Sequence, residues 1–324
     1  MEHSFWHTLP RPFFVLAPMA NITDAAFRRV IARVGKSHVL WTEFVSADGL
    51  QSRGREKLLV DLMYHESERP IVAQIFGGKP EAIHKSAALC AELGFDGVDI
   101  NMGCPDRAVE KQSAGAALIK NPSLALELIA AAKEGVTSAP PAGGRQIPIS
   151  VKTRTGYNAH KTEEWVSLLL SARPAAITIH ARTRTEMSKI PARWEEVAKA
   201  VELVRQLANK QDTLIIGNGD VKTMEEGRAR AMETGCDGIM IGRGAIGNPW
   251  VFAQRVPDLH ERLTVMREHV QLFRELLGAH KNFAEIRKHL TAYTKRLHNA
   301  AELRAQLMSA QSLDELEGVL TSML

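Results

Sequence analysis

Short apolar runs recur along the chain, and a stretch of helical periodicity follows each of them. The runs are near-continuous rather than alternating, which is typical of parallel strands that helices cover on the outer face. In order, they span Val15–Pro18, Val39–Thr42, Ile71–Gln74, Gly97–Ile100, Ile149–Lys152, Ala176–Ile179, Leu214–Gly217 and Gly238–Ile241. Amphipathic helices are expected between them, including Asp24–Val34, Glu81–Leu93, Leu124–Lys133, Glu163–Ser171 and Trp194–Leu207. Eight strand–helix units predict an α/β fold, a (β/α)8 TIM barrel, with a doubly wound open sheet as the alternative because the pattern alone does not establish closure.

The pattern changes near Trp250. After Asn248-Pro249-Trp250 the strand signal stops, and from about Leu259 to Leu324 only helical periodicity remains. A change from alternating strands and helices to helices alone is typical of a domain boundary. We therefore expect a barrel catalytic domain over residues 1–250 and a small all-helical C-terminal domain over residues 251–324.

The composition is that of an ordinary globular chain. Of its 324 residues, 45% are hydrophobic and 24% are charged, which allows a sizeable core. No run approaches the roughly 20 apolar residues that cross a bilayer, and Met1–Pro12 lacks the pattern of a signal peptide. The three cysteines, Cys90, Cys104 and Cys236, have no disulfide-framework or metal-ligand spacing. These features predict a reduced, cytoplasmic protein without a membrane segment or a metal site.

Polar residues follow nearly every predicted strand. In barrels of this kind, catalytic groups gather at the C-terminal ends of the strands. The residues at those places are Pro18 and Met19, Gln74, Asn101 and Cys104, Lys152 and Arg154, His180 and Arg182, Asn218, Gly219 and Asp220, and Gly242, Arg243 and Gly244. Strand ends are often polar for structural reasons alone, but seven of eight strands carry groups suited to a ligand. This recurrence favours a functional site over chance.

The last two strands indicate a phosphate site. Barrels frequently build one from the loops after strands seven and eight, where glycines let backbone N–H groups approach and an arginine supplies the countercharge. Asn218-Gly219-Asp220 and Gly242-Arg243-Gly244 fit that pattern. The segment Gly242–Gly247 also matches the dinucleotide fingerprint G-x-G-x-x-G. We reject this interpretation because the segment follows the last strand and no further strand completes a βαβ unit.

The motifs together resemble those of the dihydrouridine synthases, flavin enzymes that reduce the uracil 5,6 double bond in folded RNA, chiefly tRNA. The central motif is Asn101-Met102-Gly103-Cys104-Pro105. The others are Leu16–Asp24, Ala73–Gly77, Ser113–Leu118, Val151–Gly156, Ile179–Arg184, Gly217–Asp220, Ile239–Gly244, Ile286–His289 and Ala301–Arg304. The resemblance covers nearly the whole chain, and the combination of motifs is highly specific.

The resemblance implies a cofactor, a reductant and the residues that handle them. FMN would be the cofactor and NADPH the usual electron source, with Cys104 as the proton donor to uracil C5. The implied FMN-binding residues are Pro18, Met19, Gln74, Lys152, His180, Asn218, Gly219, Asp220, Gly242 and Arg243. Asn101 and Arg182 are candidates for substrate binding; Asn101 could equally cap its own loop, and His180 could simply satisfy a local backbone group.

One loop departs from the family pattern. Where the family commonly has a Tyr and a Gly after its His-Gly-Arg-Thr segment, this chain has Ser188 and Ile190. Ala181 replaces the usual Gly, and Arg193 stands where an Asp before Trp194 is typical. The loop is expected to border the active site and to affect how the substrate is placed.

The proposed chemistry agrees with the residue types. Reducing an alkene conjugated to a carbonyl needs a hydride and a proton, and side chains cannot deliver hydride, so a cofactor is required. Lys152 would offset the negative charge of a reduced flavin, unless it is only a solvated strand-end lysine. A free thiol with a pKa of about 8.5 is mostly protonated at neutral pH and can serve as an acid. Buried, inert cysteine is the alternative for Cys104 and the expected state of Cys90 and Cys236.

An RNA substrate requires a grip outside the barrel, because the target base must be extruded into a pocket. The net charge of +4 and a pI near 9.0 are compatible with a polyanionic partner and do not establish one. On an ideal helix over Phe283–Leu297, the cations Arg287, Lys288, Lys295 and His298 project from a face separate from the apolar stripe. That face suits RNA phosphates, although a solvated cationic face is the simpler explanation.

Three functions are therefore considered. A flavin-dependent reductase of uridine in tRNA leads, with ribosomal RNA not excluded. A small-molecule flavin reductase of the dihydroorotate or pyrimidine type is the alternative, but it gives the basic helical tail no purpose. An RNA-binding module without catalysis is disfavoured because every expected cofactor and acid position is filled.

Overall fold

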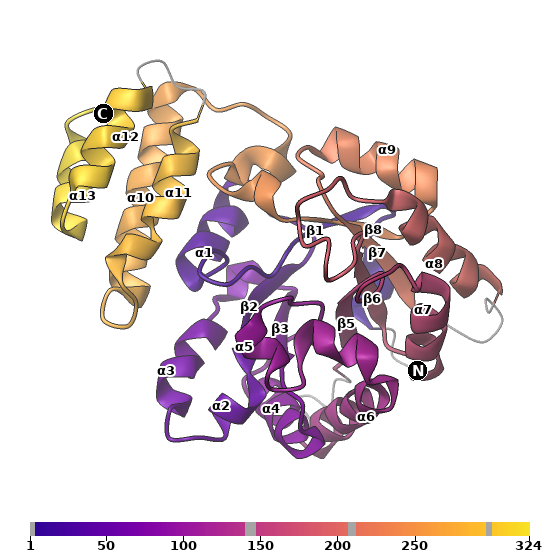
Figure 1. Cartoon of the computed structure of the whole chain (residues 1–324). Coiled ribbons are helices and arrows are strands. Elements are labelled where there is room, and N and C mark those ends of the chain that lie inside the picture. Colours follow the sequence, from indigo (N-terminus) through magenta and orange to yellow (C-terminus); the bar gives the residue numbers. More distant parts are fainter. Residues whose placement is uncertain (1–3, 140–146, 207–211, 296–299) are drawn as a thin grey trace.

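The eight strands form one parallel sheet that closes into a barrel. The computed structural model describes residues 4–139, 147–206, 212–295 and 300–324, and its strand order is β1-β8-β7-β6-β5-β4-β3-β2 (Figure 1). A parallel bridge joins Val15 to Val39, and the backbone N–H of Leu16 donates to the Val39 carbonyl, 3.3 Å away. This contact joins the two ends of the sheet, so the fold is the predicted TIM barrel and the open sheet is excluded.

The strands lie close to their predicted positions. They are β1 (Phe13–Leu16), β2 (Leu40–Ser46), β3 (Ile71–Phe76), β4 (Gly97–Met102), β5 (Ile149–Arg154), β6 (Ala176–His180), β7 (Leu214–Asn218) and β8 (Gly238–Ile241). Their residues are almost entirely buried, because helices cover the outer face and the inner face lines the barrel. This two-sided burial explains why the strands appear in the sequence as continuous apolar runs.

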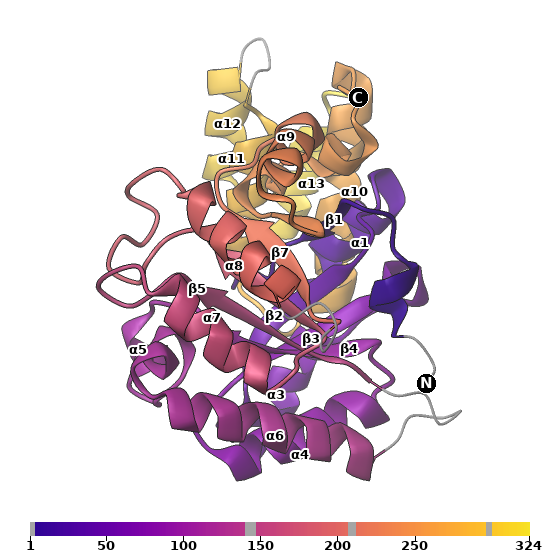
Figure 2. The ribbon, with the colours of Figure 1, turned by 90° about the vertical axis from the view of Figure 1, so that its right-hand side faces the viewer.

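Helices surround the barrel. They are α1 (Ala25–Val34), α2 (Ala47–Leu50), α3 (Arg55–Leu59), α4 (Pro80–Glu92), α5 (Arg107–Glu110), α6 (Pro122–Ser138), α7 (Thr162–Ser171), α8 (Trp194–Gln206) and α9 (Met224–Thr234). Short 3-10 helices complete this region: η1 (Phe5–Thr8), η2 (Val60–Leu62), η3 (Glu66–Glu68), η4 (Gly115–Lys120), η5 (Arg243–Ala245) and η6 (Pro249–Ala253). Figure 2 shows α4 and α6 side by side on one flank. Several helices begin at a side-chain cap; Asp24, for example, accepts the backbone N–H of Phe27 at the start of α1.

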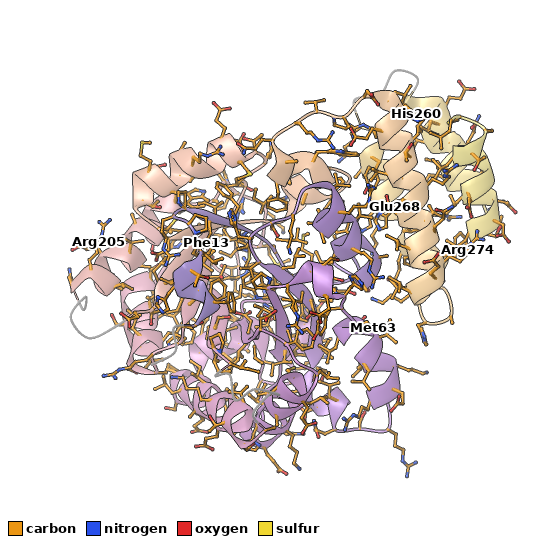
Figure 3. The ribbon with its side chains drawn as sticks, turned by 180° about the vertical axis from the view of Figure 1, so that it is seen from behind. Phe13, Met63, Arg205, His260, Glu268 and Arg274 are labelled. Carbon is orange, nitrogen blue, oxygen red and sulfur yellow. The ribbon has the colours of Figure 1, made fainter. Side chains whose placement is uncertain are left out.

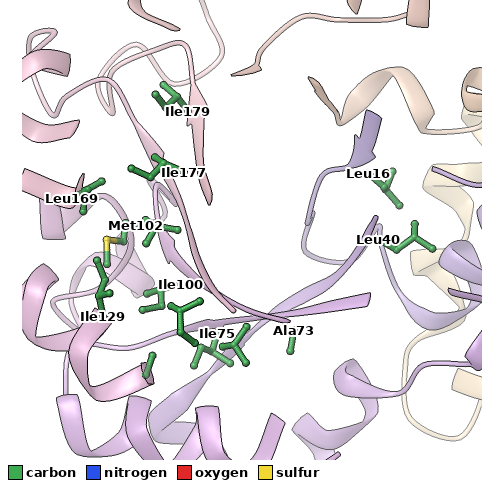
Figure 4. Close-up of a cluster of buried hydrophobic side chains, with 14 of the residues drawn as sticks. Leu16, Leu40, Ala73, Ile75, Ile100, Met102, Ile129, Leu169, Ile177 and Ile179 are labelled. Carbon is green, nitrogen blue, oxygen red and sulfur yellow. The ribbon is translucent and has the colours of Figure 1, made fainter. Parts of the chain in front are cut away.

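The hydrophobic core has an outer layer and an inner plug. The outer layer lies between the strands and the helices and includes Ile75, Ile100, Ile129 and Leu169 (Figure 4). The inner plug lies toward the start of the strands, where Trp6 packs 5.8 Å from the ring of Phe13 and 5.7 Å from the ring of Trp41. Because this plug closes the N-terminal end of the barrel, the opposite end is the one available for a ligand.

The C-terminal region is helical, as predicted, but one expected helix is broken. Its elements are α10 (Leu259–Leu277), η7 (Phe283–Glu285), α11 (Arg287–Tyr293), α12 (Ala300–Ser309) and α13 (Leu313–Thr321). The single helix expected over Phe283–Leu297 is instead the 3-10 turn η7, which Asn282 caps through the backbone N–H of Ala284, followed by the short helix α11, which ends at Tyr293. Leu297 and His298 lie outside the described residues.

The helical region shares a hydrophobic cluster with the barrel. Ala26 and Val30 of α1, together with Trp250, pack with apolar residues of α10 and α11. Figure 1 shows α1 and α10 beside each other. The predicted boundary at residue 250 stays a prediction, since η6 runs across it and the two regions bury common surface. Among the described residues, no helix is both long and apolar enough to cross a membrane.

Candidate active site

The polar residues predicted at the strand ends are brought together by the parallel register. Asn101 pairs with Lys152 across β4 and β5, and Arg154 pairs with His180 across β5 and β6. His180 in turn pairs with Asn218 across β6 and β7. Four consecutive strands thus carry polar side chains at neighbouring positions of the C-terminal rim, which we call the barrel mouth.

The loop that carries Cys104 is held from both sides. The Asn101 side-chain oxygen accepts the backbone N–H groups of Gly103, at 3.1 Å, and Cys104, at 2.9 Å. Arg154 donates from Nε to the Gly103 carbonyl at 2.7 Å, and Ala116 donates its backbone N–H to the Cys104 carbonyl at 2.9 Å. Asn101 therefore caps the loop, one of the two roles considered for it, and its contact with substrate stays a prediction.

The thiol of Cys104 is kept protonated by its surroundings. Burial raises its pKa, an effect only partly opposed by the backbone hydrogen bond from Asp106 and the charges of Arg154 and Lys152. The residue is half-buried and packs against the apolar group of Phe76, Val109 and Ala114. A half-buried, protonated thiol can donate a proton to a ligand at the mouth, whereas a fully buried one could not reach it.

Cationic groups dominate the mouth. Burial and the nearby Arg154 charge lower the pKa of Lys152 to about 8, although Asp99 and Cys104 oppose this. Burial lowers the pKa of Arg154 to about 10, and the charges of Arg182 and Arg184 act in the same direction. His180 has its pKa lowered well below the usual value by burial, reinforced by Lys152 and Arg154. Burial is the main cause of these shifts and neighbouring positive charges add to it, so an anionic ligand would favour the charged forms of Lys152 and Arg154.

A carboxylate links two arginines on the side of β7. Asp220 accepts hydrogen bonds from Arg182 and, at 2.8 Å, from Nη2 of Arg243. The Arg182 side chain is only 2% exposed and also donates from Nε to the Ile190 carbonyl, 2.6 Å away, whereas the Arg243 side chain is 63% exposed. Arg243 is thus open to a phosphate group. The substrate role of Arg182 stays a prediction, because its guanidinium is engaged within the chain.

The ends of β1 and β8 lie against each other. The Ala17 backbone N–H donates to the Ile241 carbonyl at 2.9 Å, and a methyl group placed on Gly242 would come within 3.4 Å of the Met19 sulfur. Pro18 is buried, and Met19 is half-buried and donates its backbone N–H to the Thr23 hydroxyl at 2.9 Å. Asn218 is fixed nearby, donating to the Met240 carbonyl at 2.8 Å and accepting from Lys152 at 3.4 Å. The predicted cofactor residues of three strands therefore share this part of the mouth.

The loop with the unusual residues is tied to the same part of the mouth. Gly219 has a φ of +144°, and a methyl group there would lie 2.6 Å from the Cβ of Ala192 in that loop. The backbone N–H of Ala192 donates to Asp220 at 2.9 Å, and the Arg193 side chain lies 3.7 Å from Glu186. A glycine at 219 therefore allows the loop to pack tightly against the end of β7.

The cations expected to grip RNA behave differently from one another. Arg287 donates to the Ala310 carbonyl and lies over the Phe283 ring, 4.8 Å from its centroid, so it ties α11 to the turn before α13. Lys288 and Lys295 are exposed. Within the described part of the predicted cationic face, these two lysines are the residues that can reach an external polyanion.

Sequence reasoning missed Asp99, a fully buried carboxylate beneath the mouth. It accepts Gln74 Nε2 and the Ser150 hydroxyl, each at 2.6 Å, and Gln74 accepts Asn101 Nδ2 at 3.0 Å. The available signal was a charged residue within the otherwise apolar run of β4. Among the described residues, no three His, Cys, Asp or Glu side chains are grouped so that they could hold a metal ion.

Comparisons with known proteins agree with this geometry. A family profile described as "Dihydrouridine synthase (Dus)" matches residues 15–323. The chain is 40% identical to "Probable tRNA-dihydrouridine synthase 2" of Bacillus subtilis, over 99% of this chain and 96% of that one. It is 37% identical to "Probable tRNA-dihydrouridine synthase" of Staphylococcus aureus strain COL, over 99% of this chain and 95% of that one.

A solved structure shares the fold. Histamine dehydrogenase from Rhizobium sp. 4-9 matches with a TM-score of 0.50 and 14% identity, covering 80% of this chain and 48% of that one. At this identity the likeness shows a shared fold and nothing of function. The match over 15–323 includes both the barrel and the helical region.

Proposed function

Because the chain belongs to the dihydrouridine synthase family, we propose that it reduces the uracil 5,6 double bond of uridines in tRNA to dihydrouridine, with a flavin as cofactor. The observation that carries the mechanism is the placement of Cys104, a protonated thiol on a clamped loop beside a cationic mouth. The family relatives that align over 99% of the chain are described as acting on tRNA. A reductase of small pyrimidines is therefore not favoured.

The residues at the mouth fit FMN. Its phosphate needs an exposed cation and backbone that can approach closely; Arg243 is the exposed cation, and Gly242 next to it has no side chain that would keep a ligand from its backbone. Its ring needs a cation near the edge that becomes negative on reduction, and Lys152, crowded by Arg154, is suited to that. We assign Pro18, Met19, Gln74, Lys152, His180, Asn218, Gly219, Asp220, Gly242 and Arg243 to this site. Bound FMN supplies the hydride, and NADPH is proposed as its reductant.

Cys104 supplies the proton. The high thiol pKa keeps a proton on Sγ at neutral pH, and Asn101 and Arg154 hold the loop so that Sγ keeps one position. After transfer, the thiolate is stabilised by the charges of Arg154 and Lys152, and it recovers its proton from solvent. General acid catalysis of this kind contributes roughly 10² to 10⁴-fold in rate.

The RNA contacts lie outside the mouth. A uridine within a folded RNA must be extruded to reach Cys104, so the surrounding RNA has to be held by other parts of the protein. Lys288 and Lys295 are exposed on the helical region and are proposed to contact phosphates, while Arg182 and Arg287 would act through the parts of the chain that they hold in place. With tRNA as substrate, the reaction belongs in the cytoplasm; ribosomal RNA is the second candidate substrate.

The test uses purified holoenzyme, NADPH and unmodified tRNA transcript. We expect a yellow protein that forms dihydrouridine in the transcript far faster than in free uridine. Cys104→Ala should keep the flavin spectrum and lose on the order of 10² to 10⁴-fold in rate. Cys236→Ala is the matched control, because that thiol is buried and donates to the Gly238 carbonyl away from the mouth.

Three results would contradict the proposal. A colourless protein without affinity for FMN would remove the cofactor. Equal turnover of free uridine and transcript would favour a small-molecule reductase. Full activity of Cys104→Ala would remove Cys104 from the mechanism while leaving the reaction itself intact.

A further inference from the structure

A buried carboxylate beneath the mouth has no part in the chemistry described so far. Asp99 lies on β4 with no exposed surface, opposite Gln74 of β3 and Ser150 of β5 in the sheet register. Burying an ionisable carboxyl is costly unless hydrogen bonds compensate it, and burial raises the pKa of Asp99 to about 6 despite the bonds from Gln74 and Ser150. Such a residue in the interior of a barrel calls for a functional explanation.

The hydrogen bonds around Asp99 form a chain with a fixed direction. An ionised carboxylate only accepts hydrogen bonds, and so the Gln74 amide turns its Nε2 toward Asp99, at 2.6 Å. The Gln74 oxygen then faces Asn101 and accepts its Nδ2 at 3.0 Å. The Asn101 oxygen is left facing the backbone N–H groups of Gly103 and Cys104. Reversing either amide would place a donor against a donor or an acceptor against an acceptor.

We propose that Asp99 is a positioning residue that orients Gln74 and Asn101 and thereby fixes the loop carrying the Cys104 thiol. This role rests on the proposed function of Cys104 as the proton donor. Asp99 touches neither substrate nor cofactor; it acts through two amides. The series of hydrogen bonds begins at a carboxylate that can only accept and ends at backbone N–H groups that can only donate. Its four bonds therefore support one another.

The charge of Asp99 has a second consequence at Lys152. The groups that face Lys152 are Asp99 of β4, Cys104 of the following loop, Arg154 of β5, His180 of β6 and Asn218 of β7. Of these, the Asp99 charge favours the charged lysine, while burial and Arg154 disfavour it. Removing the Asp99 charge should therefore lower the pKa of Lys152 below its value of about 8 and move any alkaline limb of the activity profile to lower pH.

The main test compares Asp99→Leu, which cannot orient Gln74, with Asp99→Asn, which keeps the size and one acceptor but no charge. The first readout is alkylation of Cys104 by iodoacetamide in flavin-free protein, where Cys90 and Cys236 are buried and protected. We expect Asp99→Leu to react about tenfold faster, since a loop that loses a hydrogen-bonded anchor is freer. Asp99→Asn should react about threefold faster, because either of its two amide orientations can form.

The second readout is steady-state kinetics of the holoenzyme. Asp99→Leu should lose on the order of 10 to 100-fold in kcat with little change in KM for tRNA, as expected of a misplaced acid. Asp99→Asn should show the alkaline limb at lower pH. Ser150→Ala is the matched control: it removes a different hydrogen bond to the same carboxylate and is not part of the series of bonds that leads to Cys104, so both readouts should change much less than in Asp99→Leu.

The outcomes separate this proposal from the function on which it rests. Wild-type alkylation and kcat in Asp99→Leu, or equal changes in Ser150→Ala, would overturn the positioning role. If Asp99→Leu does not fold, Asp99→Asn decides, and wild-type behaviour in both of its readouts would overturn the proposal. If wild-type protein forms no dihydrouridine, the proposed function fails, but the alkylation rates still test whether Asp99 fixes the loop.

Discussion

The barrel mouth and the junction between barrel and helical region both bury ionisable groups, but they balance charge differently. At the junction, Lys281 lies between two barrel carboxylates, with Nζ 2.5 Å from Glu43 and 2.7 Å from Asp61. At the mouth, Lys152 donates to the Asn218 amide oxygen at 3.4 Å, and the charge of Arg154 disfavours its charged form while that of Asp99 favours it. The junction pairs its cation with carboxylates of the same chain, whereas the cation of the mouth lies beside another cation.

The two lysines express this difference in their pKa values. Burial lowers the pKa of Lys281, but Glu43 and Asp61 raise it by more, so the net shift is upward. Burial also lowers the pKa of Lys152, and Arg154 lowers it further, to about 8. The charged form of lysine is therefore favoured at the junction and disfavoured at the mouth. The direction of the net pKa shift of the lysine therefore distinguishes the junction from the mouth.

The largest expected effect comes from breaking the junction with Lys281→Met. The substitution leaves the buried Glu43 and the half-buried Asp61 without their cation, and the loss of a cation from a buried carboxylate typically costs about 3 to 5 kcal/mol in the free energy of unfolding. Because burial already raises the pKa of Glu43 to about 7, the loss should be smaller at pH 5, where Glu43 takes up a proton, than at pH 8. Urea unfolding at both pH values measures it; a loss below about 1 kcal/mol at pH 8 would show that the junction is not cohesive.

The mouth should respond to the matching change with the opposite sign. Lys152→Met removes a cation whose pKa is lowered to about 8, so the flavin-free protein should become more stable at neutral pH, by roughly 1 to 3 kcal/mol. The same variant should bind FMN more weakly, since the charge that the ligand would offset is gone. Thermal unfolding of stripped protein and titration with FMN test the two parts. Destabilisation comparable to that of Lys281→Met would remove the distinction between the two regions.

The architecture was accessible from the sequence because its signals are local. A strand buried on both faces is mostly apolar, so β1 and β8 can be recognised in the sequence as apolar runs without knowledge of their neighbours. Helix α9 lacked such a signal, because it is rich in charged residues and leaves Met232 87% exposed. The change from the 3-10 turn η7 to the helix α11 was not predicted either, since the helical pattern of the sequence is continuous there.

The candidate site could be predicted from the sequence only in part, for a related reason. A polar residue at a strand end is visible in the sequence, and the parallel register then places Asn101, Lys152, Arg154 and His180 side by side. Which of them bond to each other depends on side-chain directions that the spacing does not contain. The link between Lys281 and Glu43 joins residues 238 positions apart, and no local pattern predicts it.

A smaller effect should follow from pH at the junction. Burial lowers the pKa of His289 to about 4, and its Nε2 donates to the Ile22 carbonyl at 3.0 Å. His289 therefore takes up a proton near pH 6.5 in the unfolded chain but only near pH 4 in the folded chain. Its contribution to stability is fully present above pH 6.5 and is lost as the pH falls toward 4. The advantage of wild type over His289→Gln in unfolding free energy should shrink by up to about 1.4 kcal/mol per pH unit below 6.5.

The comparison with His289→Gln isolates one group. Glu43 and Asp99, whose raised pKa values act in the opposite direction, are present in both proteins and cancel in the difference. Glutamine can still donate to the Ile22 carbonyl, so the variant should fold. Urea unfolding between pH 7 and pH 5 gives the two free energies at each pH. A constant difference across this range would show that His289 is not held neutral by burial.

The smallest effect separates burial from mere contact between the two regions. Arg33 of α1 forms an ion pair with Glu268 of α10, and Figure 3 labels Glu268. This ion pair joins the same two regions as Lys281 does. The Arg33 side chain is 53% exposed, and water and salt screen such pairs. Arg33→Met should therefore cost less than about 1 kcal/mol in unfolding free energy, and the cost should fall further in high salt. If Arg33→Met lowered the free energy of unfolding as much as Lys281→Met, any ion pair between the two regions would stabilise the junction equally. Burial of the charges would then not explain the stability of the junction.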